Sequence, residues 1–494
     1  MEIDNNENIF VNLSHLLLKN IISFINDFED IIRFTLVCKR WFQERNSYLV
    51  FLRDGVFVDT HKLKSYHPII QLKHNEDLYL VSEAQTVNQI TPKKLTCVDF
   101  LEFRRLIVKI DGFDISNVRD QLEKSKIKEI RLPYNVPRLS AGCLPENLEN
   151  LTIDSYSYPL EEGDLPASLK VLSLYQYNHP LINGSLPPKL EKLLITVFSK
   201  TPCLQVNVFP TTLTSIENCP YQLIKFVKYL PCLESFECNS ISIPDDFLEP
   251  GDFPDTLTSL SLRFYTSTLQ PKVIPSSIKY LTLSCYIWDL TNNSIPNESH
   301  YKYICVSDIS SDIQPNHLPP NIENLEILNY NKPLLPGSLP YGVTTLSLPK
   351  ISPKHITEGV FPSSIKTLYL FTYEDSESNQ SERRFNSKSI PNSVEALYLG
   401  HGYSEIDPTM LPDSIRTLKI KIRDLARHGI ASFKPTITLL KIGTNSQIYR
   451  IDNNNFIINS NSKLFFVNVK EFEQISEMIK KYDIILDYGL DDIF

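Results

Sequence analysis

The sequence predicts an α+β protein in which a short helical segment precedes a long solenoid of short parallel β-strands. A proline recurs at near-regular intervals, and apolar residues follow each proline at fixed offsets. The two ends, residues 1–53 and 451–494, do not fit that period. We therefore expect one repetitive body with a different structure at each end.

The bulk composition is that of an ordinary globular protein. The 494 residues are 42% hydrophobic and 22% charged, and the net charge of -9 argues against a binder of polyanions. Nine cysteines without a CxxC pair indicate buried or free thiols in a reducing compartment. No apolar run reaches about 18 residues, so we expect neither a signal peptide nor a membrane span. The prediction is a cytoplasmic protein, with the nucleus as a second possibility.

The repeat reads Φ-P-x-x-Φ-x-x-L-x-Φ, where Φ is apolar, as in PASLKVLSL at 166–174. A new copy begins about every 21 residues, and the copies extend over roughly 300 residues, which is typical of a solenoid. Its prolines are Pro145, Pro166, Pro187, Pro210, Pro254, Pro275, Pro319, Pro340, Pro362, Pro391 and Pro412. Weaker copies stand at Pro231 and Pro296, each with a one-residue slip, and at Lys434, at Thr91–Phe100 and around Ile130.

Each coil is expected to hold one short strand. Counted from the apolar residue before the proline, the apolar residues at +7 and +9 have strand period, and the one at +4 turns in from the preceding arc. Proline lacks a donor, so it lies outside the strand. The stretches between, such as NHPLINGS at 178–185, favour non-helical arcs. About fourteen such coils, stacked in parallel, would share one core.

The strand motif Leu169-Lys-Val-Leu172-Ser-Leu174 resembles that of leucine-rich repeats. The fuller unit N-x-P-L-x-x-G-x-L-P-x-x-Φ-x-x-L-x-Φ, at 178–195 and 331–348, is similar to the FNIP repeat, a leucine-rich-repeat relative. The resemblance covers about residues 140–442. We place the whole solenoid at 91–450, after a connecting region at 54–90.

The N-terminal segment 10–53 is expected to be helical. NLSHLLLKNIISFIN at 12–26 has an apolar helical face, and DFEDIIRFTLVCKRWFQERN follows at 27–46. This stretch resembles an F-box, although Leu13-Ser14 stands where that family has Leu-Pro. The resemblance implies a hook that binds the Skp1 adaptor of a cullin–RING ubiquitin ligase, through Leu13, Ile21, Ile22, Val37, Cys38 and Trp41. The alternative is a helical cap on the first coil, a role compatible with the hook.

The C-terminal segment 451–494 is expected to cap the other end of the array. KEFEQISEMIKKYD at 470–483 has apolar residues at helical spacing with polar residues opposite. It predicts a closing cap helix, and a partner-binding helix is the alternative.

The sequence does not favour catalysis. No P-loop, GxGxxG, HExxH, GxSxG or paired Cys/His set is present. A carbohydrate-active solenoid needs two close carboxylates, yet Glu326 stands alone among the outward strand positions. We therefore expect no enzyme activity, no cofactor and no metal site.

The outward positions instead suggest a binding face. They are mostly small and hydroxylic, then become aromatic and basic toward the C-terminus. The candidate partner-binding residues are Glu326, Tyr369, Phe371, Tyr398, Lys419 and Lys421. The alternative is that such residues merely suit an exposed sheet. The charged run EDSESNQSERR at 374–384 predicts a flexible loop beside this face, with a phosphorylated or gating loop as the other interpretation.

Together these features predict the non-catalytic substrate-recognition subunit of a Skp1–cullin–F-box ubiquitin ligase. The helical hook would bind Skp1, and the solenoid would bind a substrate protein that the sequence does not identify. A plain interaction scaffold without a ligase role is the alternative. We expect neither nucleic acid nor a membrane as partner.

Overall fold

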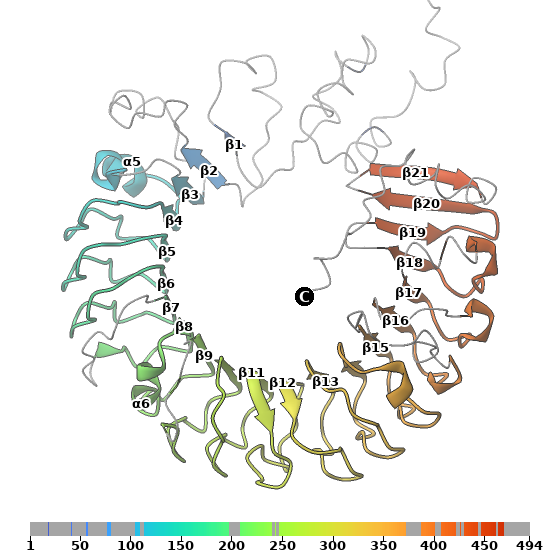
Figure 1. The fold of residues 1–494 in the computed structure, drawn as a ribbon. Coiled ribbons are helices and arrows are strands. Elements are labelled where there is room, and N and C mark those ends of the chain that lie inside the picture. Colours follow the sequence, from blue (N-terminus) through green and yellow to red (C-terminus); the bar gives the residue numbers. More distant parts are fainter. Residues whose placement is uncertain are drawn as a thin grey trace, which may run out of the picture. The chain divides into compact units, whose positions relative to one another are not determined.

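The computed structural model describes residues 104–108, 113–196, 208–239, 247–371, 387–400, 407–420, 429–442, 446–460 and 463–468, with residues 18, 41, 56–57, 77–80, 243 and 425. They fall in two compact units, Met1–Leu213 and Thr214–Phe494. In each unit, consecutive short strands stand side by side, with the coil connections on the other side (Figure 1).

The first unit is a parallel ladder in chain order. Its strands are β1 (Val56–Phe57), β2 (Asp77–Leu80), β3 (Arg105–Val108), β4 (Glu129–Leu132), β5 (Asn150–Ile153), β6 (Val171–Leu174) and β7 (Lys192–Ile195), and each pairs with the next. One arc is helical, with η4 (Ile115–Val118) and α5 (Arg119–Glu123).

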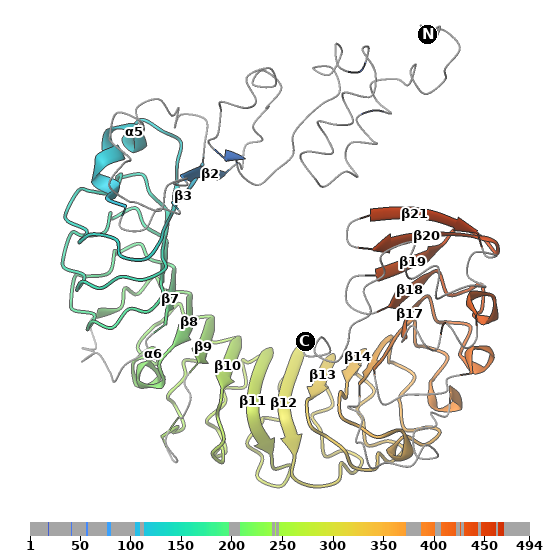
Figure 2. The same ribbon diagram turned by 45° about the horizontal axis from the view of Figure 1, so that its top comes forward.

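The second unit has the same architecture within itself and is clearest in Figure 2. Its parallel strands are β8 (Ser215–Cys219), β9 (Ser235–Asn239), β10 (Ser259–Arg263), β11 (Tyr280–Trp288), β12 (Tyr303–Ile309), β13 (Asn324–Ile327), β14 (Thr345–Ser347), β15 (Thr367–Leu370), β16 (Ala396–Leu399), β17 (Thr417–Ile420) and β18 (Leu439–Ile442). Its arcs hold short helices: η6 (Tyr221–Leu223), α6 (Ile224–Val227), η7 (Pro353–His355), η9 (Ser387–Ser389), η10 (Pro408–Met410) and η11 (Ile430–Ser432).

The predicted offsets are confirmed by the burial pattern. In β5, β6, β13, β15, β16 and β17 the residues alternate between half-buried and buried. The three apolar positions of one coil, for example Ile365, Leu368 and Leu370, are each 0% exposed. Because the coils supply the same inward row, the stacked coils of each unit share a core.

The proline sets up the turn that enters each strand. The amide three residues after it donates to the proline carbonyl, as from Leu169 to Pro166 over 3.1 Å and from Ile365 to Pro362 over 3.2 Å. A glycine three residues before the proline has a positive φ in several coils, at 87° in Gly163 and 81° in Gly337. This left-handed backbone suits glycine, which lacks a Cβ.

In several coils a hydroxyl two residues after the proline joins the coil to the one before. Ser364 Oγ donates to the Val343 carbonyl over 2.7 Å, and Ser414 Oγ donates to the Val394 carbonyl over 2.7 Å. Ser168, Thr212, Thr256 and Ser277 make the equivalent bond in other coils. These bonds satisfy carbonyls that the short strands leave without a ladder partner.

Charged side chains also join neighbouring coils of the first unit. Glu149 accepts hydrogen bonds from Lys128 and, over 3.2 Å, from Lys170, so charges of alternating sign lie on three successive coils. The hydrogen bonds from Lys128 and Lys170 lower the pKa of the Glu149 carboxyl below its ordinary value. We call these three residues the alternating ladder.

Several details differ from the sequence-based expectation. At Pro296 the slip is two residues, because the buried residues are Tyr301, Ile304 and Val306. Strands β1 and β2 lie in the region expected to be only a connection. After β18 the order changes: β19 (Ser446–Arg450), β20 (Asn455–Ser460) and β21 (Lys463–Asn468) pair antiparallel, a closing hairpin structure that the sequence analysis did not anticipate.

Some predictions lie outside the described residues. They are the strand copy at 91–100, the charged loop at 374–384 and the cap helix at 470–483. Within the described ranges, none of the helices has the length and hydropathy that a bilayer crossing requires.

Candidate functional site

The candidate site is a row of outward side chains on β13 to β18. Each member is the register partner of the next, so the side chains form one line across six parallel strands. We call it the outer row, and it consists of Glu326, Ser347, Tyr369, Tyr398, Lys419 and Lys441. All six are half-buried, whereas their neighbours along each strand are buried and point into the core. With strands about 4.8 Å apart, the row is about 24 Å long.

Two stacked tyrosines occupy the middle of the outer row. The rings of Tyr369 and Tyr398 have centroids 4.3 Å apart and an interplanar angle of 15°. Burial, and then the neighbouring Tyr398, raise the pKa of the Tyr369 hydroxyl, so this group stays a neutral hydrogen-bond donor. Stacking fixes both rings and leaves their edges as a rigid surface.

Phe371 extends the aromatic surface and is held by Gly400. Its ring centroid lies 6.3 Å from that of Tyr369. A Cβ on Gly400 would stand 2.4 Å from a ring carbon of Phe371, closer than real Cβ contacts. Position 400 must therefore be glycine for Phe371 to keep this place.

Two lysines end the row, and both lie over aromatic rings. Lys419 Nζ is 5.3 Å from the centroid of Phe371, and Lys441 Nζ is 5.2 Å from that of Tyr398. Lys441 Nζ also donates to the Tyr398 hydroxyl over 3.4 Å. Cation–π contacts of this kind stabilise a cation without neutralising it.

The acidic end of the row is satisfied within the chain. The hydroxyl of Tyr303 donates to Glu326 Oε2 over 2.6 Å, and the hydroxyl of Ser347 donates to Oε1 over 3.2 Å. Burial, and then the hydrogen bond to Glu326, raise the pKa of Tyr303 far above its ordinary value. Burial, followed by the charge of Glu326, raises the pKa of the neighbouring Cys305 thiol to about 11. These groups stay protonated around a single carboxylate.

The structure brings most of the predicted partner-binding residues together. Tyr369, Phe371, Tyr398 and Lys419 form one cluster, and Glu326 lies two strands away from it. Lys421 lies outside the described residues. The sequence analysis missed Lys441, which holds the same offset in its coil as Lys419, so extending the outward list by one coil would have found it.

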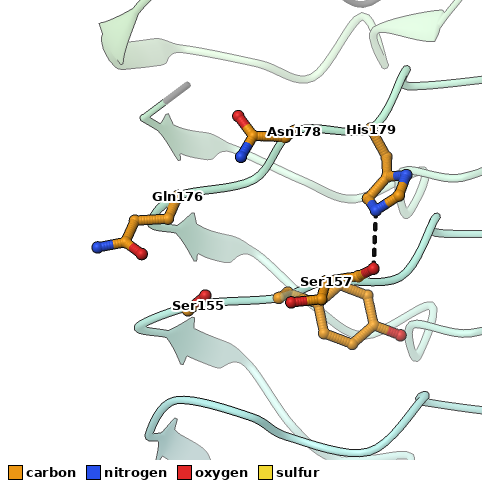
Figure 3. Close-up of a pocket in the computed structure, with 6 residues that line it drawn as sticks. Ser155, Ser157, Gln176, Asn178 and His179 are labelled. Carbon is orange, nitrogen blue, oxygen red and sulfur yellow. Dashed lines mark hydrogen bonds between the residues drawn. The ribbon is translucent and has the colours of Figure 1, made fainter. Parts of the chain in front are cut away.

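The first unit also contains a hollow lined by turn residues. Ser155, Tyr156, Ser157, Gln176, Asn178 and His179 line a cavity of about 480 Å³ beside the turns that follow β5 and β6. Figure 3 shows the His179 ring above the backbone of Ser157, where Nε2 donates to the Ser157 carbonyl over 2.8 Å. Its lining residues include no carboxylate, lysine or arginine. They belong to equivalent turns of two successive coils.

The described part of the chain contains no group of three or more His, Cys, Asp or Glu side chains placed to hold a metal ion. Six cysteines in these ranges carry free thiols: Cys143, Cys219, Cys232, Cys238, Cys285 and Cys305.

Of the predicted adaptor-binding residues, only Trp41 is described. It is helical and 6% exposed, and Leu18, the other described residue of this segment, is helical and 0% exposed. The Trp41 indole therefore packs within the chain, which fits the core role that a helical cap requires. Leu13, Ile21, Ile22, Val37 and Cys38 lie outside the described residues.

Comparison with known proteins adds to this picture. The FNIP Repeat family model matches residues 134–176, 156–196, 245–286 and 311–350. No curated protein matches the sequence.

Several solved structures are similar to this chain at low sequence identity. CroV588, described as a novel circular LRR protein, is 18% identical with a TM-score of 0.48; the match covers 76% of this chain and 60% of CroV588. LegL7 from Legionella pneumophila is 16% identical with a TM-score of 0.28, over 54% of this chain and 89% of that one. The mouse RP105/MD-1 complex is 15% identical with a TM-score of 0.36; the match covers 72% of this chain and 59% of that one.

The repeat, its strand offsets and the family match agree with one another. The matched ranges contain β5, β6, β7, β10, β13, β14 and most of β11, and the same coil geometry is found up to β18. The chain carries FNIP repeats that fold as a solenoid of parallel-stranded coils.

Proposed function

We propose that this chain is a non-enzymatic protein-interaction scaffold whose recognition surface is the outer row. The observation that carries the proposal is the difference between the two faces of each strand. Inward residues are interchangeable leucines and isoleucines, whereas the outward residues of β13 to β18 change from acid to hydroxyl to aromatic to cation. Tyrosine and other aromatic side chains are enriched in the cores of protein interfaces and among the residues that dominate their binding energy.

Affinity capture with the purified chain tests this role. We expect proteins retained by the wild type to be lost with the Tyr369→Ala/Tyr398→Ala variant. Tyr341→Ala is the matched control, because Tyr341 is 78% exposed and belongs to a coil of the same unit but not to the outer row. A set of captured proteins that is the same for all three chains would contradict the proposal.

We further propose that the scaffold is the substrate-recognition subunit of a Skp1–cullin–F-box ubiquitin ligase, acting in the cytoplasm or nucleus. The F-box resemblance of residues 10–53 supports the adaptor contact, and the length of the repeat array supports a separate site for a substrate protein. The chain would then have two partners, the Skp1-type adaptor with its cullin–RING ligase and the protein to be ubiquitylated.

Co-purification with a Skp1-type adaptor tests the ligase role. We expect the wild type to retain the adaptor and Leu13→Asp to lose it, with Lys19→Asp as a control that adds the same acid at a polar position. Trp41→Ala is a poor probe, because the indole is 6% exposed and its removal would disturb packing. Failure of the wild type to bind the adaptor would leave the plain scaffold as the function.

A further inference from the structure

Two cysteines lie side by side in the core between β8 and β9. Cys219 and Cys238 are register partners on these parallel strands, and each is 0% exposed and carries a free thiol. Both side chains point into the core, so the two sulfurs lie on the same side of the sheet. Partner residues on neighbouring strands are about 4.8 Å apart. That spacing is within the range of Cα separations, about 4.4 to 6.8 Å, that a disulfide bridges without movement of the backbone.

A β-bulge brings Cys219 to this position. Asn218 stands at the offset where other coils have their last inward apolar residue, but it is half-buried and has a φ of 54°. The register shifts between Ile216 and Cys219, and Cys219 takes the buried place instead. Asn239 Nδ2 donates to Asn218 Oδ1 over 3.3 Å and holds that side chain outside the core. Bulges re-aim side chains in this way, and here the bulge pairs two thiols.

The closed coil keeps the thiols unreactive. Burial, and then a hydrogen bond with the Cys238 thiol, raise the pKa of the Cys219 thiol well above its ordinary value. Cys219 Sγ also donates to the Glu237 carbonyl over 3.2 Å. The thiolate, and not the thiol, is the nucleophile in sulfur chemistry. The pair is therefore expected to react when β8 and β9 separate in a local opening of the coil.

We propose that Cys219 and Cys238 form a reversible disulfide in response to peroxide, and that this disulfide fastens β8 to β9. One thiolate attacks an oxygen of hydrogen peroxide, which forms a sulfenic acid and releases hydroxide. The second thiolate attacks the sulfenic sulfur and displaces another hydroxide, and the two protons that left the thiols convert both hydroxides to water. Two electrons thus pass from the thiols to the peroxide. Two molecules of a small thiol such as glutathione reverse the reaction by exchange and become oxidised to their own disulfide.

Another pair of cysteines on adjacent strands lacks this geometry. Cys285 and Cys305 lie on β11 and β12, but the register partner of Cys305 on β11 is Thr282. Cys285 stands three residues further along the strand, which is about 10 Å at 3.3 Å per residue. This pair should not become linked, so it is an internal control for disulfides that form without a matching register.

Peptide mapping under non-reducing conditions tests the proposal. The full chain is treated with hydrogen peroxide, its remaining thiols are alkylated, and it is digested with trypsin, which cleaves after Lys225 and Lys228 and so separates the two cysteines. The Cys203→Ser/Cys232→Ser variant leaves one thiol in each of the two peptides. We expect peroxide to produce the linked pair of peptides, and dithiothreitol to separate it again.

Thermal unfolding provides a second measurement. A disulfide that closes a loop of about 20 residues stabilises the folded chain, so peroxide should raise the melting temperature by at least about 3 °C. Cys219→Ala should abolish this shift. Cys232→Ser is the matched control and should retain it, because Cys232 is exposed and belongs to the same coil as Cys238. The mapping needs neither of these variants, so it stands even if Cys219→Ala fails to fold.

Three outcomes overturn the inference: no linked Cys219–Cys238 peptides after peroxide, an equal yield of linked Cys285–Cys305 peptides, or a shift in melting temperature that persists in Cys219→Ala. Each would leave the pair as small apolar side chains of the core. None of them touches the proposed scaffold function, which fails instead if no captured protein depends on Tyr369 and Tyr398.

Discussion

The alternating ladder of the first unit and the basic end of the outer row are both lines of charged side chains across adjacent coils. In the ladder, Glu149 lies between Lys128 and Lys170, so each charge meets its opposite within the chain. In the outer row, Lys419 meets Lys441, and the charges of neighbouring coils repeat. The first arrangement joins coils through opposite charges, whereas in the second each lysine lies over an aromatic ring. The difference indicates that packing of the core does not determine the outward residues of a repeat fold.

The largest expected effect is a loss of folding stability on truncating a core residue beneath the outer row. Leu368 is 0% exposed and adjoins Tyr369, so Leu368→Ala should lower the free energy of unfolding by about 3 kcal/mol through lost burial and a cavity. Thr367→Ala, at the outward neighbour of Leu368, should lower the free energy of unfolding by less than about 1 kcal/mol. Urea denaturation measures both, and equal losses would erase the distinction between inward and outward positions.

A smaller effect is expected where hydroxyls join coils. Ser364→Ala removes the bond to the Val343 carbonyl and should lower stability by about 1 kcal/mol. The adjacent Ser363 is exposed, so Ser363→Ala should change stability by less than about 0.5 kcal/mol. Thermal unfolding of the two variants side by side decides the matter. A loss from Ser364→Ala that is no larger than the loss from Ser363→Ala would contradict a stabilising role for this hydroxyl bond.

The alternating ladder should contribute less still, and in a pH-dependent way. The folded chain lowers the pKa of Glu149, so the unfolded chain binds this proton more readily. The ion pairs therefore stabilise the fold above the ordinary glutamate pKa of about 4.3, and this stability is lost as the pH falls through the lowered folded value. Glu149→Gln should cost less than about 1 kcal/mol near neutral pH and almost nothing in acid. A cost that is constant with pH would contradict the assignment.

The sequence predicts the coil because each copy buries apolar residues at the same offsets, so the pattern recurs along the chain. Proline offsets alone also align Tyr369 with Tyr398, although the insert lengthens that interval to 29 residues. The packing of Phe371 against Gly400 could not be predicted from the sequence, because a close contact with backbone leaves no periodic signal. The two-residue slip at Pro296 likewise hid the placement of Tyr303 beside Glu326.

The closing strands were missed for a different reason. Alternation of apolar residues in β19 and β20 is the same for parallel and antiparallel pairing. The turn was nevertheless readable, because Asp452 accepts from the amides of Asn454 and Asn455 over 2.7 and 2.9 Å, as an aspartate in a tight turn does. Turn chemistry between two short apolar runs was the available signal.

The central claim is that the outer row serves recognition and contributes little to folding. Lys441→Gln tests it most directly, with urea unfolding and capture of partner proteins measured on the same preparation. We expect the free energy of unfolding to stay within about 0.5 kcal/mol of the wild type, because the lost contact with Tyr398 and the relieved repulsion from Lys419 offset each other. The amount of captured partner protein should fall by about fivefold. A loss of about 2 kcal/mol in stability with unchanged capture would contradict the account.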